Sequence, residues 1–194
     1  MDNHPLVPVI YGSVRTERQG IKFARFVCKQ LIERNIEAVL VDPLERPFPL
    51  LDRMFKEFPA GEAPPVMTEL ASLFRRADGF VVVSGEYNNG IPPALKNMMD
   101  HFLEEYFWRP AGIACYSGGH WGGVRAAMQL RMTLSEMGMA TIPSLLPIAR
   151  VGESFSDDGT PADPATVGFS KQFFDELEWY VSAMGAQRRQ GVPY

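Results

Sequence analysis

The stretch GFVVVSGEYNNGIPPALKN, residues 79 to 97, shows the pattern on which the rest of the chain is organised. Its opening run, GFVVVS, is apolar without interruption, which is typical of a strand covered on both faces. A glycine-containing turn follows, and IPPALKN then opens a predicted helix. The stretch therefore predicts one strand, one loop and one helix, the unit from which α/β folds are built.

The same order repeats on both sides of this stretch. Further strands are predicted at 6–11, 36–41, 111–116 and about 140–148, and further helices at 20–34 and at about 66–76, 123–137 and 164–184. Pro8 is expected among the first residues of its strand, because it cannot donate a ladder hydrogen bond. Strands that alternate with helices predict a parallel sheet with helices on both faces, since parallel neighbours need crossover connections.

Helix 20–34 is expected to pack on the sheet through one apolar face. The residues at helical spacing on that face are Ile21, Ala24, Val27, Cys28, Leu31 and Ile32. This spacing indicates an amphipathic helix with its apolar side turned to the core.

Three glycine-containing loops follow predicted strands. GSVRTERQG (12–20) comes after the first strand, SGEYNNGIPP (84–93) runs on from the third, and SGGHWGG (117–123) follows the fourth. In a doubly wound five-stranded parallel sheet ordered 2-1-3-4-5 these strands are neighbours, so their loops converge on one crevice at the topological switch point. The sequence thus predicts a three-layer α/β/α fold with a ligand site at that crevice.

The loop at 12–20 has the chemistry of an anion site. Ser13 can donate a hydroxyl, Arg15 and Arg18 can donate charge-assisted hydrogen bonds, and the next helix points its positive dipole end at the loop. This set suits a phosphate monoester. No Gly-Lys-Ser/Thr follows as in a Walker A loop, and Gly12 and Gly20 do not fit the dinucleotide pattern GxGxxG. A tight turn with two solvated arginines is the alternative.

Composition predicts one globular domain over 1–194, with a mobile tail from about 185. Of the 194 residues 46% are apolar and 22% charged, and the net charge of −4 argues against general nucleic-acid binding. No run reaches the ~18 apolar residues that span a bilayer, and MDNHPLVP lacks the plan of a signal peptide. Cys28 and Cys115 are expected to be reduced thiols. We expect a cytoplasmic protein without membrane contact or metal.

Two of these stretches resemble a known family. GSVRTERQG resembles the GSxR phosphate loop, and GEYNNGIPPALKNMMDHF resembles the PEYN segment, of the NADPH-dependent FMN reductases, a family that also holds quinone, azo-dye and chromate reductases. The likeness runs from about Val9 to Leu146. It implies a flavodoxin-like fold, non-covalent FMN, and a homodimer or homotetramer. It also implies hydride transfer from NADPH or NADH to FMN and then to a quinone, azo compound, metal ion or flavin.

The resemblance also implies where the cofactor lies. Ser13, Arg15 and Arg18 would hold the FMN phosphate at the helix start near Gly20. Glu86, Tyr87 and Asn88, preceded by Gly85, would border the ribityl chain and the ring, and Ser117, Gly118 and Gly119 would meet the pyrimidine edge. Because FMN carries the chemistry at N5, no catalytic side chain is expected.

Some residues leave alternatives open. Gly85 stands where the family has proline. Trp121 could cover the flavin, shape the substrate pocket or simply pack, and His120 could be a flavin-edge donor or face solvent. The segment 102–110, with Phe102, Tyr106, Phe107 and Trp108, could be an oligomer contact or core, and the Pro-rich segment 43–65 could be a functional or interface loop.

Two other functions are compatible with the sequence. A non-catalytic flavodoxin-like module would carry electrons or signals to a protein partner, and a bulky GGHWGG loop that excluded the nicotinamide would favour it. A nucleotide-binding or interaction protein without flavin is the third possibility.

Overall fold

A five-stranded parallel sheet in the order β2-β1-β3-β4-β5 forms the centre of the computed structural model, which describes residues 4–194. The strands are β1 (Leu6–Tyr11), β2 (Glu37–Val41), β3 (Phe80–Gly85), β4 (Pro110–Tyr116) and β5 (Ala140–Ile148). All four neighbouring pairs are parallel. The strand order and the positions of all five strands confirm the prediction from sequence.

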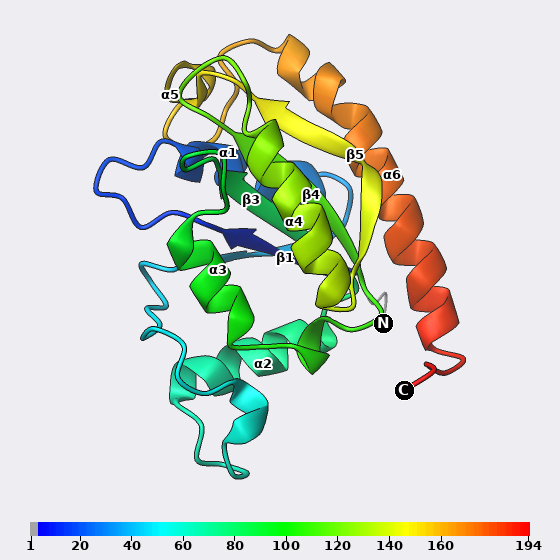
Figure 1. Cartoon of the computed structure of the whole chain (residues 1–194). Coiled ribbons are helices and arrows are strands. Elements are labelled where there is room, and N and C mark those ends of the chain that lie inside the picture. Colours follow the sequence, from blue (N-terminus) through cyan, green and yellow to red (C-terminus); the bar gives the residue numbers. More distant parts are fainter. Residues whose placement is uncertain (1–3) are drawn as a thin grey trace.

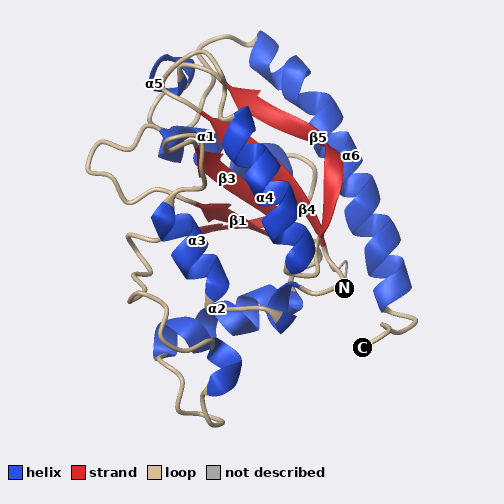
Figure 2. Cartoon of the chain, in the orientation of Figure 1, coloured by secondary structure: helices blue, strands red, loops and turns tan. Residues whose placement is uncertain are grey.

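Helices cover both faces of the sheet (Figure 1). The helices are α1 (Gly20–Ile32), α2 (Pro65–Arg76), α3 (Pro93–Asp100), α4 (Val124–Glu136), α5 (Val151–Ser154) and α6 (Ala165–Arg188). α1 and α6 pack on one face, and α2, α3 and α4 on the other (Figure 2). Within β3, Val81 and Val83 pack in the core beneath α1 and α6, and Phe80 and Val82 pack in the core on the opposite face, beneath α2, α3 and α4. Burial on both faces explains the unbroken apolar run of this strand.

Pro8 lies where β1 has only one paired neighbour. It is opposite Val39 of β2, whereas the pairing of β1 with β3 begins one residue later, at Val9 and Val81. A residue without an N–H is therefore accommodated near the start of an otherwise central strand, as the sequence indicated.

The buried face of α1 differs from the predicted one. Phe23 and Phe26 lie in the core with Ile21 and Val27, whereas Ile32 is 58% exposed and Cys28 is only partly buried. The prediction was wrong for Ile32 because two phenylalanines, which bury more area than an isoleucine, turn the helix toward their own side.

The aromatic segment 102–110 divides between the core and the surface. Phe102 and Tyr106 are fully buried in the core under α2, so they are not available to another subunit. Phe107 and Trp108 are partly exposed and pack against the ring of Tyr194, and the Trp108 indole donates to the Tyr194 carbonyl at 3.2 Å. The alternative of core packing is therefore correct for the first two aromatic residues.

The predicted last helix ends later than expected. α6 continues to Arg188, beyond the predicted limit at residue 184. Its last turn is tied to the start of the sheet through Asp78: Arg188 donates to Asp78 Oδ1 at 2.9 Å, and the Leu6 amide donates to Asp78 Oδ2 at 3.1 Å. The two ends of the fold meet there. Among residues 4–194, no helix is long and apolar enough to cross a membrane.

Candidate functional site

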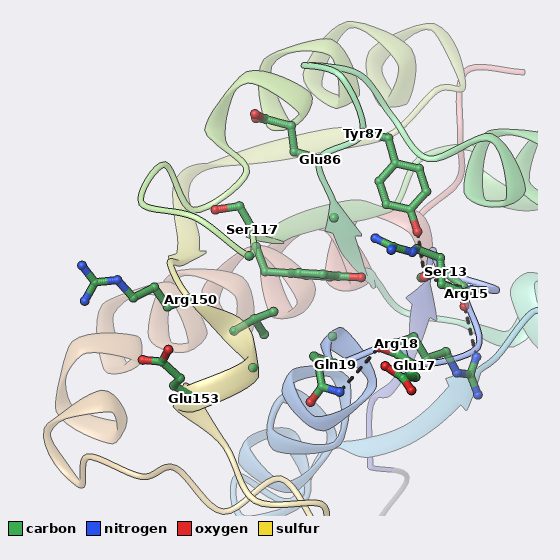
Figure 3. A pocket seen from close by; sticks show the side chains of 16 residues that line it. Ser13, Arg15, Glu17, Arg18, Gln19, Glu86, Tyr87, Ser117, Arg150 and Glu153 are labelled. Carbon is green, nitrogen blue, oxygen red and sulfur yellow. Dashed lines mark hydrogen bonds between the residues drawn. The ribbon is translucent and has the colours of Figure 1, made fainter.

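The three glycine-containing loops converge on one crevice at the carboxyl ends of β1, β3 and β4 (Figure 3). It has a volume of about 340 Å³ and is lined by Ser13, Arg15, Glu17, Arg18, Gln19, Gly20, Gly85, Glu86, Tyr87, Tyr116, Ser117, Gly118, Arg150, Val151, Gly152 and Glu153. Of the residues predicted for the site, only Asn88 and Gly119 do not line this crevice. The predicted convergence of the loops is therefore present in the fold.

One end of the crevice has the groups that an anion-binding site needs. Ser13 is 3% exposed, and its hydroxyl lies 2.9 Å from that of Tyr87 and accepts from the Arg15 amide at 3.4 Å. Helix α1 begins at Gly20, so the N–H groups of its first turn are directed at this end. The Arg15 side chain is exposed beside them. A hydroxyl, a cation and free amides together suit a phosphate.

Arg18 is held in a salt bridge. Its guanidinium forms a two-pronged pair with the buried carboxylate of Asp42, with Nη2 2.5 Å from Oδ2, and Nη1 donates to the Ser13 carbonyl at 3.1 Å. The hydrogen bonds to Asp42 raise the pKa of Arg18. Because Asp42 balances its charge, Arg18 contributes to the shape of the loop, and Arg15 brings the uncompensated charge.

The floor of the crevice is Tyr116, the last residue of β4, which the sequence reasoning missed. Its ring passes so close to two glycines that a Cβ at Gly20 would lie 2.1 Å from Cζ, and a Cβ at Gly85 3.1 Å from it. Its hydroxyl donates to that of Tyr11 at 3.4 Å. Burial raises the pKa of both tyrosines, that of Tyr116 well above its usual range. At Gly85 the approach is tighter than most Cβ contacts, so a side chain there would require the ring to move by a few tenths of an ångström.

Both carboxylate oxygens of Glu86 are hydrogen-bonded to the first turn of helix α4. One carboxylate oxygen accepts from the Arg125 and Ala126 amides at 3.0 and 3.3 Å, and the other accepts from the Arg125 guanidinium at 2.7 to 2.9 Å. It satisfies amides at the amino end of the helix, where negative charge is favourable. Glu86 therefore borders the crevice while orienting the helix that begins behind it.

The remaining wall comes from the loops after β4 and β5. Ser117 Oγ accepts from the Gly122 amide at 2.9 Å and donates to the Gly119 carbonyl at 3.0 Å, which fixes the turn. A Cβ at Gly118 would meet nothing within 4 Å, so this end of the crevice is open. The β5 loop adds Arg150 to Glu153, which the sequence did not reveal because they lie in a short helical turn without a glycine-rich motif.

His120 and Trp121 lie at the outer edge of this wall. His120 Nδ1 is 3.1 Å from Nη2 of Arg150. Trp121 is 67% exposed, stacks under the Arg125 guanidinium at 5.6 Å from its ring centre, and does not line the crevice. It does not close the crevice, so the feature that would have favoured a non-catalytic module is not found.

The crevice fits FMN by its donor set. A hydroxyl, a cation and helix amides lie at one end, aromatic rings in the middle, and an open wall of backbone groups at the other. A phosphate, a polyol chain and a planar ring present complementary groups in that order. The assignment of individual residues to FMN remains a prediction.

Comparison with known proteins indicates the same family as the sequence motifs. The profile of the NADPH-dependent FMN reductase family matches residues 5–152. An NAD(P)H-dependent FMN reductase of Schizosaccharomyces pombe is 32% identical over 73% of this chain and 71% of its own length. A quinone reductase of Pseudomonas putida is 27% identical over 90% of this chain and 94% of its own length.

Among solved structures, the flavoenzyme NAD(P)H:(acceptor) oxidoreductase FerB from Paracoccus denitrificans has a TM-score of 0.73 at 22% identity, over 91% of this chain and 98% of that one. A flavodoxin from Pseudomonas aeruginosa has the same fold, with a TM-score of 0.56 at 15% identity over 93% and 99%. With its sheet order, its three converging loops and this match over most of its length, the chain belongs to the NADPH-dependent FMN reductase family.

Proposed function

We propose that the crevice between Ser13 and Glu153 is where this FMN-dependent NAD(P)H oxidoreductase binds its flavin. The observation that carries the proposal is the convergence of a phosphate-type loop, an aromatic floor and a glycine wall on one hollow. Ser13, Arg15 and the first amides of α1 bind the phosphate. Tyr87 and Tyr116 flank the middle of the crevice, and the backbone at Ser117 and Gly118 binds the edge of the ring.

Bound FMN supplies the hydride chemistry, accepting from a nicotinamide and donating to an acceptor in turn. The protein binds and orients the flavin and leaves one side of the crevice open. The Tyr116 hydroxyl donates to that of Tyr11, and this contact holds the aromatic ring in place beneath the crevice. The open wall at Gly118 gives the nicotinamide and then the acceptor access to the same place. A quinone, azo compound, metal ion or free flavin can serve as acceptor, and sequential use of one crevice predicts ping-pong kinetics.

The phosphate seat is tested with Arg15→Ala. Loss of one or two charge-assisted hydrogen bonds of about 1.5 to 3 kcal/mol each should weaken FMN binding roughly ten- to several-hundred-fold. Titration of the apoprotein with FMN, followed by flavin fluorescence, measures this. Arg76→Ala is the matched control, because Arg76 is an exposed arginine at the end of α2, outside the crevice.

Riboflavin, which lacks the phosphate, separates this effect from a general loss of affinity. It should bind the wild-type protein weakly and Arg15→Ala about equally weakly. If riboflavin bound as tightly as FMN, or if Arg15→Ala kept wild-type affinity, the loop would not be the phosphate seat.

We further propose that the protein is a homo-oligomer in the cytoplasm. Met128 and Met132 lie four residues apart on the outer side of α4 and form a small exposed apolar strip, and Trp121 in the loop before this helix is also exposed. Such an apolar strip is typical of a surface that another chain covers. A reducing compartment suits Cys28 and Cys115, which are free thiols.

A further inference from the structure

A second hollow adjoins the crevice. It has a volume of about 480 Å³ and is lined by His120, Ala149, Arg150, Glu153, Ser154, Ala162, Asp163 and Thr166. Arg150 and Glu153 line both hollows, so they stand at the passage between them. A ligand longer than a nicotinamide ring can therefore have one end in the crevice and the other in this hollow.

Arg150 and His120 place two donors at the passage. The guanidinium has no acceptor, so in their 3.1 Å contact Nη2 of Arg150 donates to Nδ1 of His120. The ring proton of a neutral His120 is then on Nε2, which is left to donate to a ligand. A planar guanidinium beside an imidazole N–H is a suitable pair for a phosphate.

The backbone of Arg150 is held in an unusual conformation that fixes this position. Its φ of 46° and ψ of 48° lie in the left-handed region, which non-glycine residues rarely occupy. Its amide donates to the Gly119 carbonyl at 2.9 Å, and the next amide, of Val151, donates to the Ser117 carbonyl at 3.1 Å. The arginine is therefore attached to the wall of the crevice. Such strain persists where the surroundings enforce it, and it concentrates at functional sites.

The carboxylates of the hollow restrict the ligand class. Asp163 accepts from the Ala165 amide at 2.9 Å and so caps α6, and Glu153 is exposed. A simple polyanion would meet repulsion from both. A nucleotide whose phosphate groups face the cations while its hydroxyl and amino groups face the carboxylates satisfies both at once.

We propose that Arg150 and His120 bind the 2′-phosphate of NADPH, with the adenosine portion in the adjoining hollow near Glu153 and Asp163. This inference rests on the proposed function, because it places the nicotinamide in the crevice. It makes Arg150 a specificity-determining residue for NADPH over NADH.

The kinetic test compares the two nucleotides. Arg150→Gln should lower kcat/KM for NADPH roughly ten- to a hundredfold more than it lowers kcat/KM for NADH, mainly by raising KM, because only NADPH carries the 2′-phosphate. His120→Ala should act in the same direction with a smaller effect. Arg76→Gln, outside both hollows, should change neither. Equal losses with both nucleotides, or an unchanged NADPH:NADH ratio, would overturn the inference.

A binding measurement gives a readout independent of turnover. By calorimetry on the FMN-loaded protein, adenosine 2′,5′-bisphosphate should bind the wild type at least tenfold more tightly than AMP, and Arg150→Gln should remove most of that difference. If the two nucleotides bound the wild type equally, the hollow would not recognise the 2′-phosphate. Failure of the wild type to reduce its flavin with either NADPH or NADH would count against the proposed function instead, while the calorimetric comparison would still decide the role of Arg150.

Discussion

The two arginines of the loop after β1 differ in what they face. Arg15 is exposed at the mouth of the crevice, whereas the guanidinium of Arg18 is turned to the buried carboxylate of Asp42. The sequence could not distinguish them, because Asp42 is 24 residues away from Arg18 in the chain. Only the pairing of β1 with β2 brings the loop and this aspartate together.

Arg18→Leu should therefore lower stability as well as FMN affinity. Removing one partner leaves the Asp42 carboxylate buried without its counter-ion, at a cost of about 3 to 5 kcal/mol. Urea unfolding followed by circular dichroism measures this. The double variant Arg18→Leu/Asp42→Leu should recover much of the loss, and a double variant as unstable as the single one would contradict the assignment.

The buried tyrosines make a prediction about alkaline pH. Burial raises the pKa of Tyr11, Tyr106 and Tyr116. In the unfolded chain they ionise near the ordinary value of about 10, so the folded state holds more protons above that pH, and stability falls as the pH rises further. The tyrosinate absorbance that develops in the native protein around pH 10 to 11 should be clearly smaller than in the denatured chain, where all six tyrosines are free. Equal absorbance changes would show that these hydroxyls are not buried.

At the scale of elements, the start of α1 and the ends of β3 and β4 meet around one ring. Gly20 and Gly85 allow Tyr116 to lie between them. Because Gly20 has no side chain, the first turn of α1 can lie directly against this ring. The amino end of α1 is thereby held directly beside the loop 12–20, which we propose binds the phosphate.

Gly20→Ala should push these elements apart. Its Cβ would lie 2.1 Å from the Tyr116 ring, and overpacking of this kind costs about 1 to 3 kcal/mol. Gly118→Ala is the matched control, since its Cβ would meet nothing within 4 Å. Thermal unfolding should show a lower midpoint for the first variant alone. Combining Gly20→Ala with Tyr116→Ala should cost less than the sum of the single changes; strict additivity would show that the ring is not the obstacle.

Sequence patterns predicted the strands and the long helices well, because the strands are short apolar runs and each long helix begins at or directly after a glycine or a proline. They failed for contacts that depend on several elements. From the sequence alone, Tyr116 is the last apolar residue of a predicted strand and Arg150 is an ordinary surface charge. Neither sequence neighbourhood shows that one forms the crevice floor and the other the passage to the second hollow.

At the scale of the whole molecule, the proposed oligomer should depend on the exposed strip of Met128 and Met132 on α4. The double change Met128→Lys/Met132→Lys places charges on that strip and should convert the assembly to a monomer at micromolar concentration, as measured by small-angle scattering. Phe169→Lys, an exposed apolar position on α6, is the control and should leave the mass unchanged. A wild-type monomer under the same conditions would contradict the proposal.

The overall architecture was open to prediction because the alternation of strands and helices restricts a chain of this length to few topologies. The sequence did not predict which aromatic residues lie in the core and which lie at the surface. Phe102 and Phe107 lie five positions apart in one segment, yet the first is in the core and the second at the surface. That difference follows from where α2 crosses the segment, which no local pattern encodes.

The meeting of Leu6 and Arg188 at Asp78 has a practical consequence for protein engineering. Since the first strand and the last helix reach the same carboxylate, a short peptide can connect them, and the chain can be cut elsewhere to give a circular permutant. The exposed turn at Gly61 is a suitable cleavage point, because its surroundings are open and it lies in the loop between β2 and α2, outside the crevice. A redox reporter could then be fused at that new opening, so that the crevice at the carboxyl end of the sheet stays unobstructed while the signal is read out from the loop.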